Sequence, residues 1–167
     1  AVLQSIIAPA TQLAGDFQLA EAVLGSLVRV SELRGDTKLA IHHLEQLCEF
    51  SDAFRDPDDE VMLHRRFMLE LLRLHVPSTQ SENRSSVATL AQIEEKYSAL
   101  DTPADESLLE MRTHLAEAYR LLGDTDGLLS VLSKTLDTMK AMGLSVDHPK
   151  VIQTLNELRS ITNSSSH

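Results

Sequence analysis

A short motif recurs at a fixed distance in this sequence and limits what the chain can fold into more than any other feature. Gly35-Asp36-Thr37 is repeated as Gly123-Asp124-Thr125, 88 residues or twice 44 residues further on. Leucines keep a spacing of 44 or 43 residues, at Leu27, Leu71, Leu115 and Leu158. A repeat of about 34 to 47 residues built from two helices is typical of solenoids, in which each unit buries its apolar face only against its neighbours.

Apolar residues follow helical spacing over almost the whole chain. In the clearest stretch, one stripe at steps of three and four residues is formed by Leu108, Met111, Leu115, Ala118 and Leu122. Strands would show alternation with a period of two, rich in β-branched and aromatic residues. Aromatic residues make up only 4% of the chain, and we find no such alternation. The sequence therefore predicts an all-α protein.

Glycine-aspartate and proline-containing breaks, which end and cap helices, divide the chain at regular distances. They predict eight helices, near residues 2–14, 17–34, 37–54, 58–76, 84–99, 104–122, 125–142 and 148–161. Most of these segments are joined by short turns, which is the pattern of helical hairpins stacked side by side. The least regular turn is the polar segment 77–83, which we expect to be a mobile loop.

These breaks also predict the domain organisation. We expect a single repeat domain over residues 1–162, with units near 17–56, 58–101 and 104–146 and a partial unit over 148–162. Residues 163–167 are expected to be a disordered tail or a tag remnant. The chain starts without a Met, and we interpret it as a fragment of a larger protein.

Composition excludes several classes of ligand. The formal net charge of −10 would repel a nucleic-acid backbone, whose neutralisation supplies most non-specific affinity. A membrane span needs about 20 consecutive apolar residues, and the sequence has no such run. The single Cys48 forms no internal disulfide and no thiolate metal site, and we expect it to be a buried, inert thiol. We predict no nucleic acid and no membrane as partners, and an intracellular protein, cytoplasmic or nuclear.

The residues that carry chemistry in enzymes and metal proteins lack the required spacing here. His42 and His43 are adjacent, and neighbouring helical residues point about 100° apart. No two histidines stand at the i, i+4 spacing that lets them share a metal ion on one helix. The glycines form no phosphate-binding loop, and the acidic run 56–60 lacks a calcium-binding loop but suits a helix N-terminus. We predict no catalytic residue, no metal, no cofactor and no enzymatic activity.

Two segments resemble a known family of helical repeats. Leu115-Ala116, followed by Tyr119 and by Gly123-Asp124, resembles the first helix and turn of a tetratricopeptide repeat (TPR), although Ser31 stands where the first repeat would match Tyr119. Residues 143–151, leading into residues 154–158, resemble the kinesin-light-chain type of repeat, which has Asp-His-Pro between one repeat and the next.

In that Asp-His-Pro segment, Asp147 is suited to cap the following helix and Pro149 to stand in its first turn. We expect His148 to be a first-turn residue with no ligand or catalytic role.

The resemblance implies a right-handed α-α superhelix, a TPR-like solenoid of about eight antiparallel helices. The first helix of each hairpin would line its concave face. The predicted partner-binding residues on that face are Arg29, Arg66, Arg73, His114, Arg120 and Asn156. Arginines in an acidic protein are suited to clamp the carboxylates of an acidic partner segment. Alternatively, they are ordinary solvated charges paired with Glu32, Glu70 or Glu117.

The predicted function is a protein-interaction scaffold or adaptor that holds a segment of a partner protein in its concave groove. One alternative is a recognition or regulatory domain of a larger enzyme. Another is a peptide or small-ligand sensor of TPR type, for which a closed apolar pocket would replace the open groove.

Overall fold

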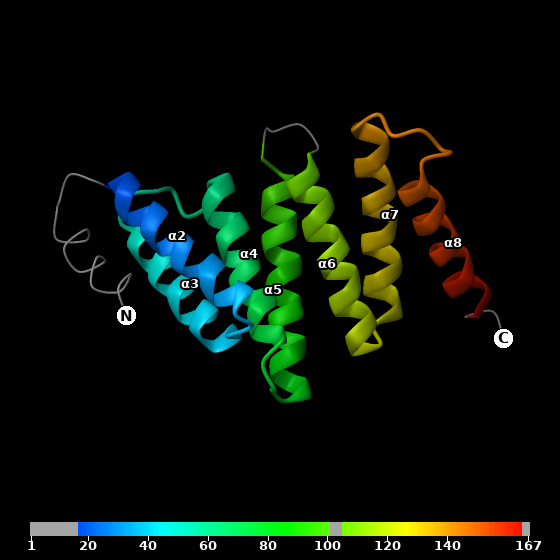
Figure 1. The fold of residues 1–167 in the computed structure, drawn as a ribbon. Coiled ribbons are helices and arrows are strands. Elements are labelled where there is room, and N and C mark those ends of the chain that lie inside the picture. Colours follow the sequence, from blue (N-terminus) through cyan, green and yellow to red (C-terminus); the bar gives the residue numbers. More distant parts are fainter. Residues whose placement is uncertain (1–16, 101–104, 165–167) are drawn as a thin grey trace. The chain divides into compact units, whose positions relative to one another are not determined.

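The computed structural model describes residues 17–100 and 105–164, and these ranges contain seven helices and no strand (Figure 1). The helices are α2 (Phe17–Leu33), α3 (Thr37–Asp52), α4 (Glu60–Leu74), α5 (Gln80–Ser98), α6 (Glu106–Leu122), α7 (Thr125–Ala141) and α8 (Pro149–Ser164). Each corresponds to a predicted helix. The helix predicted near residues 2–14 lies outside the described residues.

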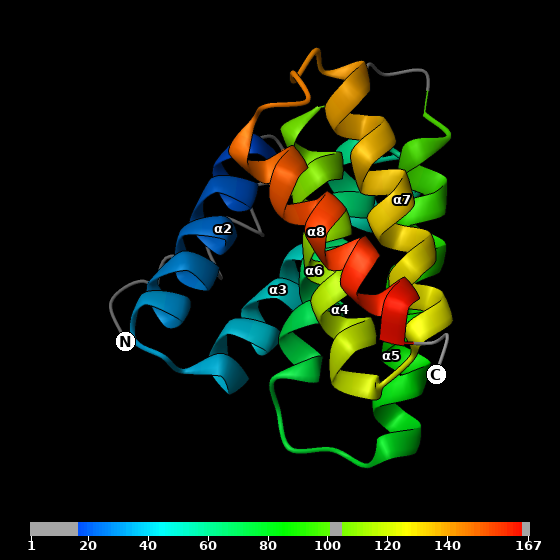
Figure 2. The ribbon, with the colours of Figure 1, turned by 90° about the vertical axis from the view of Figure 1, so that its right-hand side faces the viewer.

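The chain divides into two compact units, residues 1–78 and residues 79–167. In the first unit α2 packs on α3 and α3 on α4, whereas in the second α5, α6, α7 and α8 pack in succession. Within each unit neighbouring helices run antiparallel (Figure 1). Figure 2 shows the second unit from the side of α8, which lies beside α7. The boundary falls inside the predicted repeat 58–101, between its two helices.

The repeated Gly-Asp-Thr motif joins two helices in each unit by one set of hydrogen bonds. Gly35 and Gly123 both have φ of 69°, a conformation that glycine adopts without a Cβ clash. The next residue closes the preceding helix, because the amide of Asp124 donates to the carbonyl of Tyr119 at 3.0 Å. The same aspartate begins α7 by accepting from the amide of Gly127 at 3.0 Å.

Only residues 77–79 of the predicted loop 77–83 lie outside a helix. Helix α5 begins at Gln80 instead of near 84, because Thr79 and Glu82 form a reciprocal capping box. The Thr79 hydroxyl accepts from the Glu82 amide at 3.2 Å, and the Glu82 carboxylate accepts from the Thr79 amide at 2.7 Å. The expectation of a long polar loop was wrong, since the spacing of Thr and Glu specifies a helix start.

The start of α8 also differs from the expected arrangement. The helix begins at Pro149, which stands in its first turn as expected, one residue after the predicted start at 148, so that His148 precedes the helix instead of standing in its first turn. The ring Nδ1 of His148 accepts from the amide of Lys150 at 3.3 Å. Helix α8 then continues through Ser164, three residues past its predicted end at 161.

Each unit has its own apolar core. In the first, one cluster is formed by Leu24, Val28, Leu44, Leu47, Cys48 and Leu69. The Cys48 thiol is thus buried as expected, and burial raises its pKa. In the second unit the most deeply buried large side chains are Leu90, Met111 and Leu115. The regularly spaced leucines Leu27, Leu71 and Leu115 are all buried.

Tyr119 packs its ring against the backbone of Gly127 on α7. A Cβ at this glycine would lie 2.5 Å from the ring, so a larger residue would not fit. The 88-residue spacing places Ser31 and Leu39 of the first unit at the equivalent positions. A large and a small residue have therefore exchanged places, which keeps the combined volume similar.

Leu115→Ala should destabilise the protein by about 2 to 5 kcal/mol, since it leaves a cavity in the second unit. Leu115 is 2% exposed, whereas Leu121 on the same helix is 83% exposed. Leu121→Ala should therefore change the free energy of unfolding by about 0.5 kcal/mol or less. Urea denaturation measures both, and hydrogen exchange should rise mainly in α5–α8. Equal losses for the two variants would contradict the assigned core.

Candidate functional site: the groove between α6 and α8

The predicted binding arginines of the first unit lie mostly in ion pairs. Arg66 Nη2 contacts Asp52 Oδ1 at 2.6 Å, and Arg73 Nη2 contacts Glu45 Oε1 at 2.8 Å. Arg73 also pairs with Glu70, as the alternative interpretation expected. Arg29 is exposed, and no hydrogen bond or ion pair holds its guanidinium within the described part of the chain.

In the second unit, too, two of the three predicted residues lie beside acidic side chains. His114 lies between two acidic side chains of its own helix, 3.8 Å from Glu110 and 3.6 Å from Glu117. Arg120 of α6 forms an ion pair with Glu157 of α8. Asn156 is exposed on α8. The structure therefore pairs Arg120 with an acidic side chain of another helix. Within residues 17–100 and 105–164, the predicted arginines do not form a row of unpaired charges.

Sequence reasoning missed a partly buried carboxylate in the first unit. Glu21 of α2 accepts from Arg55 Nε and Nη2, each at 2.9 Å, from Arg65 Nη1 at 2.6 Å and from Ser51 Oγ at 3.0 Å. Hydrogen bonds from Arg55, and then from Arg65 and Ser51, lower the pKa of Glu21 from 4.5 to about 2 against the opposing effect of burial. The cluster ties α2 to α3, to α4 and to the segment between them.

A carboxylate that is fully buried holds the other unit together. Glu94 of α5 is 1% exposed. It accepts from Arg112 Nε at 2.7 Å and from Lys134 Nζ at 3.1 Å. Arg112 Nη1 donates in turn to the carbonyl of Lys134 at 2.8 Å and to the hydroxyl of Thr138. Both carboxylate oxygens of Glu94 and the Nε and Nη1 groups of Arg112 are thus hydrogen-bonded, which offsets the cost of burying the ion pair.

Arg112→Leu should cost about 3 to 5 kcal/mol, because it removes the main partner of a buried carboxylate. Arg66→Leu removes a largely exposed ion pair and should cost about 1 kcal/mol or less. Urea unfolding at neutral pH gives both values. A similar loss of unfolding free energy for the two variants would contradict the expectation that the buried ion pair matters more to stability than the exposed one.

The pKa of Glu21 predicts acid sensitivity. In the unfolded chain the carboxyl takes up its proton near pH 4.5, and in the native state only near pH 2. The unfolded state therefore binds more protons between these values, and the stability that Glu21 contributes above pH 4.5 is lost as pH falls towards 2. Glu21→Gln should lower stability at pH 7 and reduce the drop between pH 7 and pH 3, measured by urea midpoints. Glu49→Gln, an exposed change on α3, should leave that drop intact.

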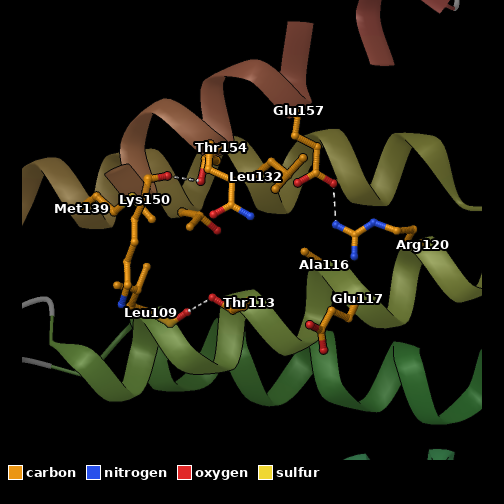
Figure 3. Close-up of a pocket in the computed structure, with 12 residues that line it drawn as sticks. Leu109, Thr113, Ala116, Glu117, Arg120, Leu132, Met139, Lys150, Thr154 and Glu157 are labelled. Carbon is orange, nitrogen blue, oxygen red and sulfur yellow. Dashed lines mark hydrogen bonds and ion pairs between the residues drawn. The ribbon is translucent and has the colours of Figure 1, made fainter. Parts of the chain in front are cut away.

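A groove in the second unit, which we call the α6–α8 groove, is the candidate site (Figure 3). Its floor is apolar and is formed by Leu109, Ala116, Leu132 and Met139. Helices α6 and α8 form its two walls and α7 its base, because α6 and α8 both pack on α7 and not on each other. The groove encloses a pocket of about 300 Å³ that remains partly open to solvent.

Charged side chains stand at the two ends of the α6–α8 groove. The Arg120–Glu157 ion pair spans it at one end, and Lys150 reaches across from α8 at the other (Figure 3). No ion pair holds the Lys150 ammonium in the described ranges. Lys150 and Glu157 were missed because the repeat spacing was read along the first helices of the upstream units. The polar stripe Lys150, Gln153, Thr154 and Glu157, at steps of three and four residues, would have found this wall.

The hydroxyl groups in the α6–α8 groove are not placed for catalysis. Thr113, Thr135 and Thr154 each donate to a backbone carbonyl of their own helix, at 2.7 to 2.9 Å. None of the three donates to a carboxylate or an imidazole, which an activated nucleophile needs. The arrangement can bind by apolar contact and by charge.

Residues 17–100 and 105–164 contain neither a metal-binding cluster nor a membrane-spanning helix. No group of three histidine, cysteine or acidic side chains within these ranges could hold a metal ion. No helix there is both long enough and apolar enough to cross a membrane.

The fold is that of TPR-like helical repeats. No protein-family model and no curated protein sequence matches the chain. Among solved structures, it is similar to a Podosopora anserina protein described as a kinesin light chain with nearly identical TPR-like repeats. The match has a TM-score of 0.72 and 18% identity and covers 98% of this chain and 76% of the other.

A second solved structure has the same fold. BtubC (BKLC) from P. vanneervenii matches with a TM-score of 0.61 and 13% identity, over 98% of this chain and 72% of the other. The predicted class, an all-α helical repeat solenoid of TPR type, is confirmed, as is the resemblance to kinesin-light-chain repeats.

Proposed function

We propose that this chain is an interaction module that binds a segment of a partner protein in the α6–α8 groove. TPR-like helical repeats are in general protein-interaction scaffolds, and the structural neighbours support that general role. The single observation that carries the proposal is the groove itself, which has an apolar floor between two helical walls and polar groups at its rim. Binding sites combine such an apolar surface with a few polar groups that fix orientation.

The partner segment in this proposal is acidic. Lys150 lies at the groove without an ion-pair partner in the described chain, so a carboxylate that reaches it would gain an ion pair without breaking one. In this proposal Lys150 binds a carboxylate of the partner, a role that the sequence predicted for a row of arginines. The proposal involves no catalysis, no cofactor and no nucleic acid.

The alternative of a small-ligand sensor has less support. A sensor needs a pocket that encloses most of its ligand, whereas the α6–α8 groove is partly open. The alternative of a recognition domain within a larger enzyme is compatible with the same groove and differs only in what is attached to the chain.

Gln153→Trp should block the groove, because Gln153 is an exposed residue that lines it and an indole would fill the space above the floor. Peptides selected on the wild-type protein from a random-sequence display library should bind this variant at least about tenfold more weakly, by calorimetry. Gln92→Trp, the same change at an exposed position of α5 outside the groove, is the matched control and should bind normally. Peptides that bind both variants equally would place the interface elsewhere.

A further inference from the structure

We infer that Glu157 is an internal competitor of the partner segment: its carboxylate holds Arg120 in the free protein and must release it to a carboxylate of the partner. The inference rests on the proposed function of the α6–α8 groove and adds a residue that sets its selectivity. In this view the α6–α8 groove is closed when the Arg120–Glu157 ion pair is formed and open when the pair is broken.

The position of the ion pair supports this role. Arg120 comes from α6 and Glu157 from α8, and both side chains line the groove. The two helices are neighbours only through α7, so this ion pair is a direct connection between the two walls (Figure 3). A segment lying along the floor towards this end passes under or displaces that connection.

Breaking the Arg120–Glu157 ion pair costs little free energy. The two side chains are 49% and 28% exposed, and ion pairs that contact solvent add little stability. The buried Glu94–Arg112 pair of the same unit is the opposite case, since neither side chain is more than 10% exposed. Exchange of the Glu157 carboxylate for a partner carboxylate keeps the charge-assisted hydrogen bond of Arg120 and frees Glu157 to be hydrated.

Nearby charges favour replacing the Glu157 carboxylate with a carboxylate of the partner. The other acidic side chain of the lining, Glu117, lies 3.6 Å from His114, whereas Lys150 at the far end has no ion-pair partner in the described chain. Release of Arg120 therefore presents a second cation to the groove, at the end opposite Lys150. A partner with two separated carboxylates would use both, and a partner without them would leave the ion pair closed.

The test is a double-mutant cycle on binding, with a groove-dependent acidic peptide from the library selection as the probe. Glu157→Gln should tighten binding by about twofold to fivefold, the range expected when an exposed competing ion pair is removed. Arg120→Gln should weaken binding. Glu157→Gln added to Arg120→Gln should give no gain, because the residue for which Glu157 competes is gone.

Glu110→Gln is the matched control, since it removes the same charge from an exposed position on α6 outside the groove lining and should leave affinity unchanged. Circular dichroism checks that each variant is folded. An unchanged affinity for Glu157→Gln, or a gain that persists without Arg120, would overturn the role of Glu157 and leave the groove intact. The selection is also run on Glu157→Gln. If neither protein yields an acidic peptide that Gln153→Trp blocks, the proposed function and this inference both fail.

Discussion

In each unit one carboxylate that lies between the helices, partly buried for Glu21 and fully buried for Glu94, fixes how the helices meet, and the rest of the packing depends on it. Glu21 on α2 and Glu94 on α5 stand on the first described helix of their units, and each binds two cationic side chains from later in the chain. Apolar contacts between helices are non-directional and tolerate small shifts along the axis. A guanidinium that donates to a buried carboxylate tolerates far less, because a lost hydrogen bond there leaves a charge without compensation. The carboxylates therefore set the register, while the leucines supply most of the stabilisation.

The α6–α8 groove follows from this arrangement. Helix α7 is fixed against α6 by the contacts of Arg112 with the Lys134 carbonyl and with Thr138. Helix α8 rests on α7, where Val151 packs with Leu109 and Met139 in one apolar cluster. The two walls are thus positioned by a shared base, so the width of the groove depends on buried residues, of which Leu109 and Met139 also form part of its floor. The charges at its rim are free to differ without disturbing that base.

The sequence predicted the elements well because their boundaries are local. Gly-Asp-Thr turns and apolar periodicity lie within a few residues of the structure that they specify. The ion pairs were predicted only in part. Glu70 was expected as a partner of the arginines and does pair with Arg73, but periodicity says nothing of Glu45 on another helix, 2.8 Å from Arg73. Ser31 departs from the repeat pattern for a related reason, since the compensating position is Leu39. Pairs of this kind follow from three-dimensional packing, and a single sequence does not contain them as a spacing.

The Gly-Asp turn between two helices also affects how the chain folds during synthesis. Its hydrogen bonds run from Tyr119 to Gly127, so all the groups that close one helix and open the next lie within nine consecutive residues. Contacts this close in sequence form quickly. During synthesis the α2–α3 hairpin can close before α4 has emerged from the ribosome, whereas Glu94 must wait for Lys134, 40 residues later. Vectorial synthesis would then build the hairpins first and lock their register afterwards.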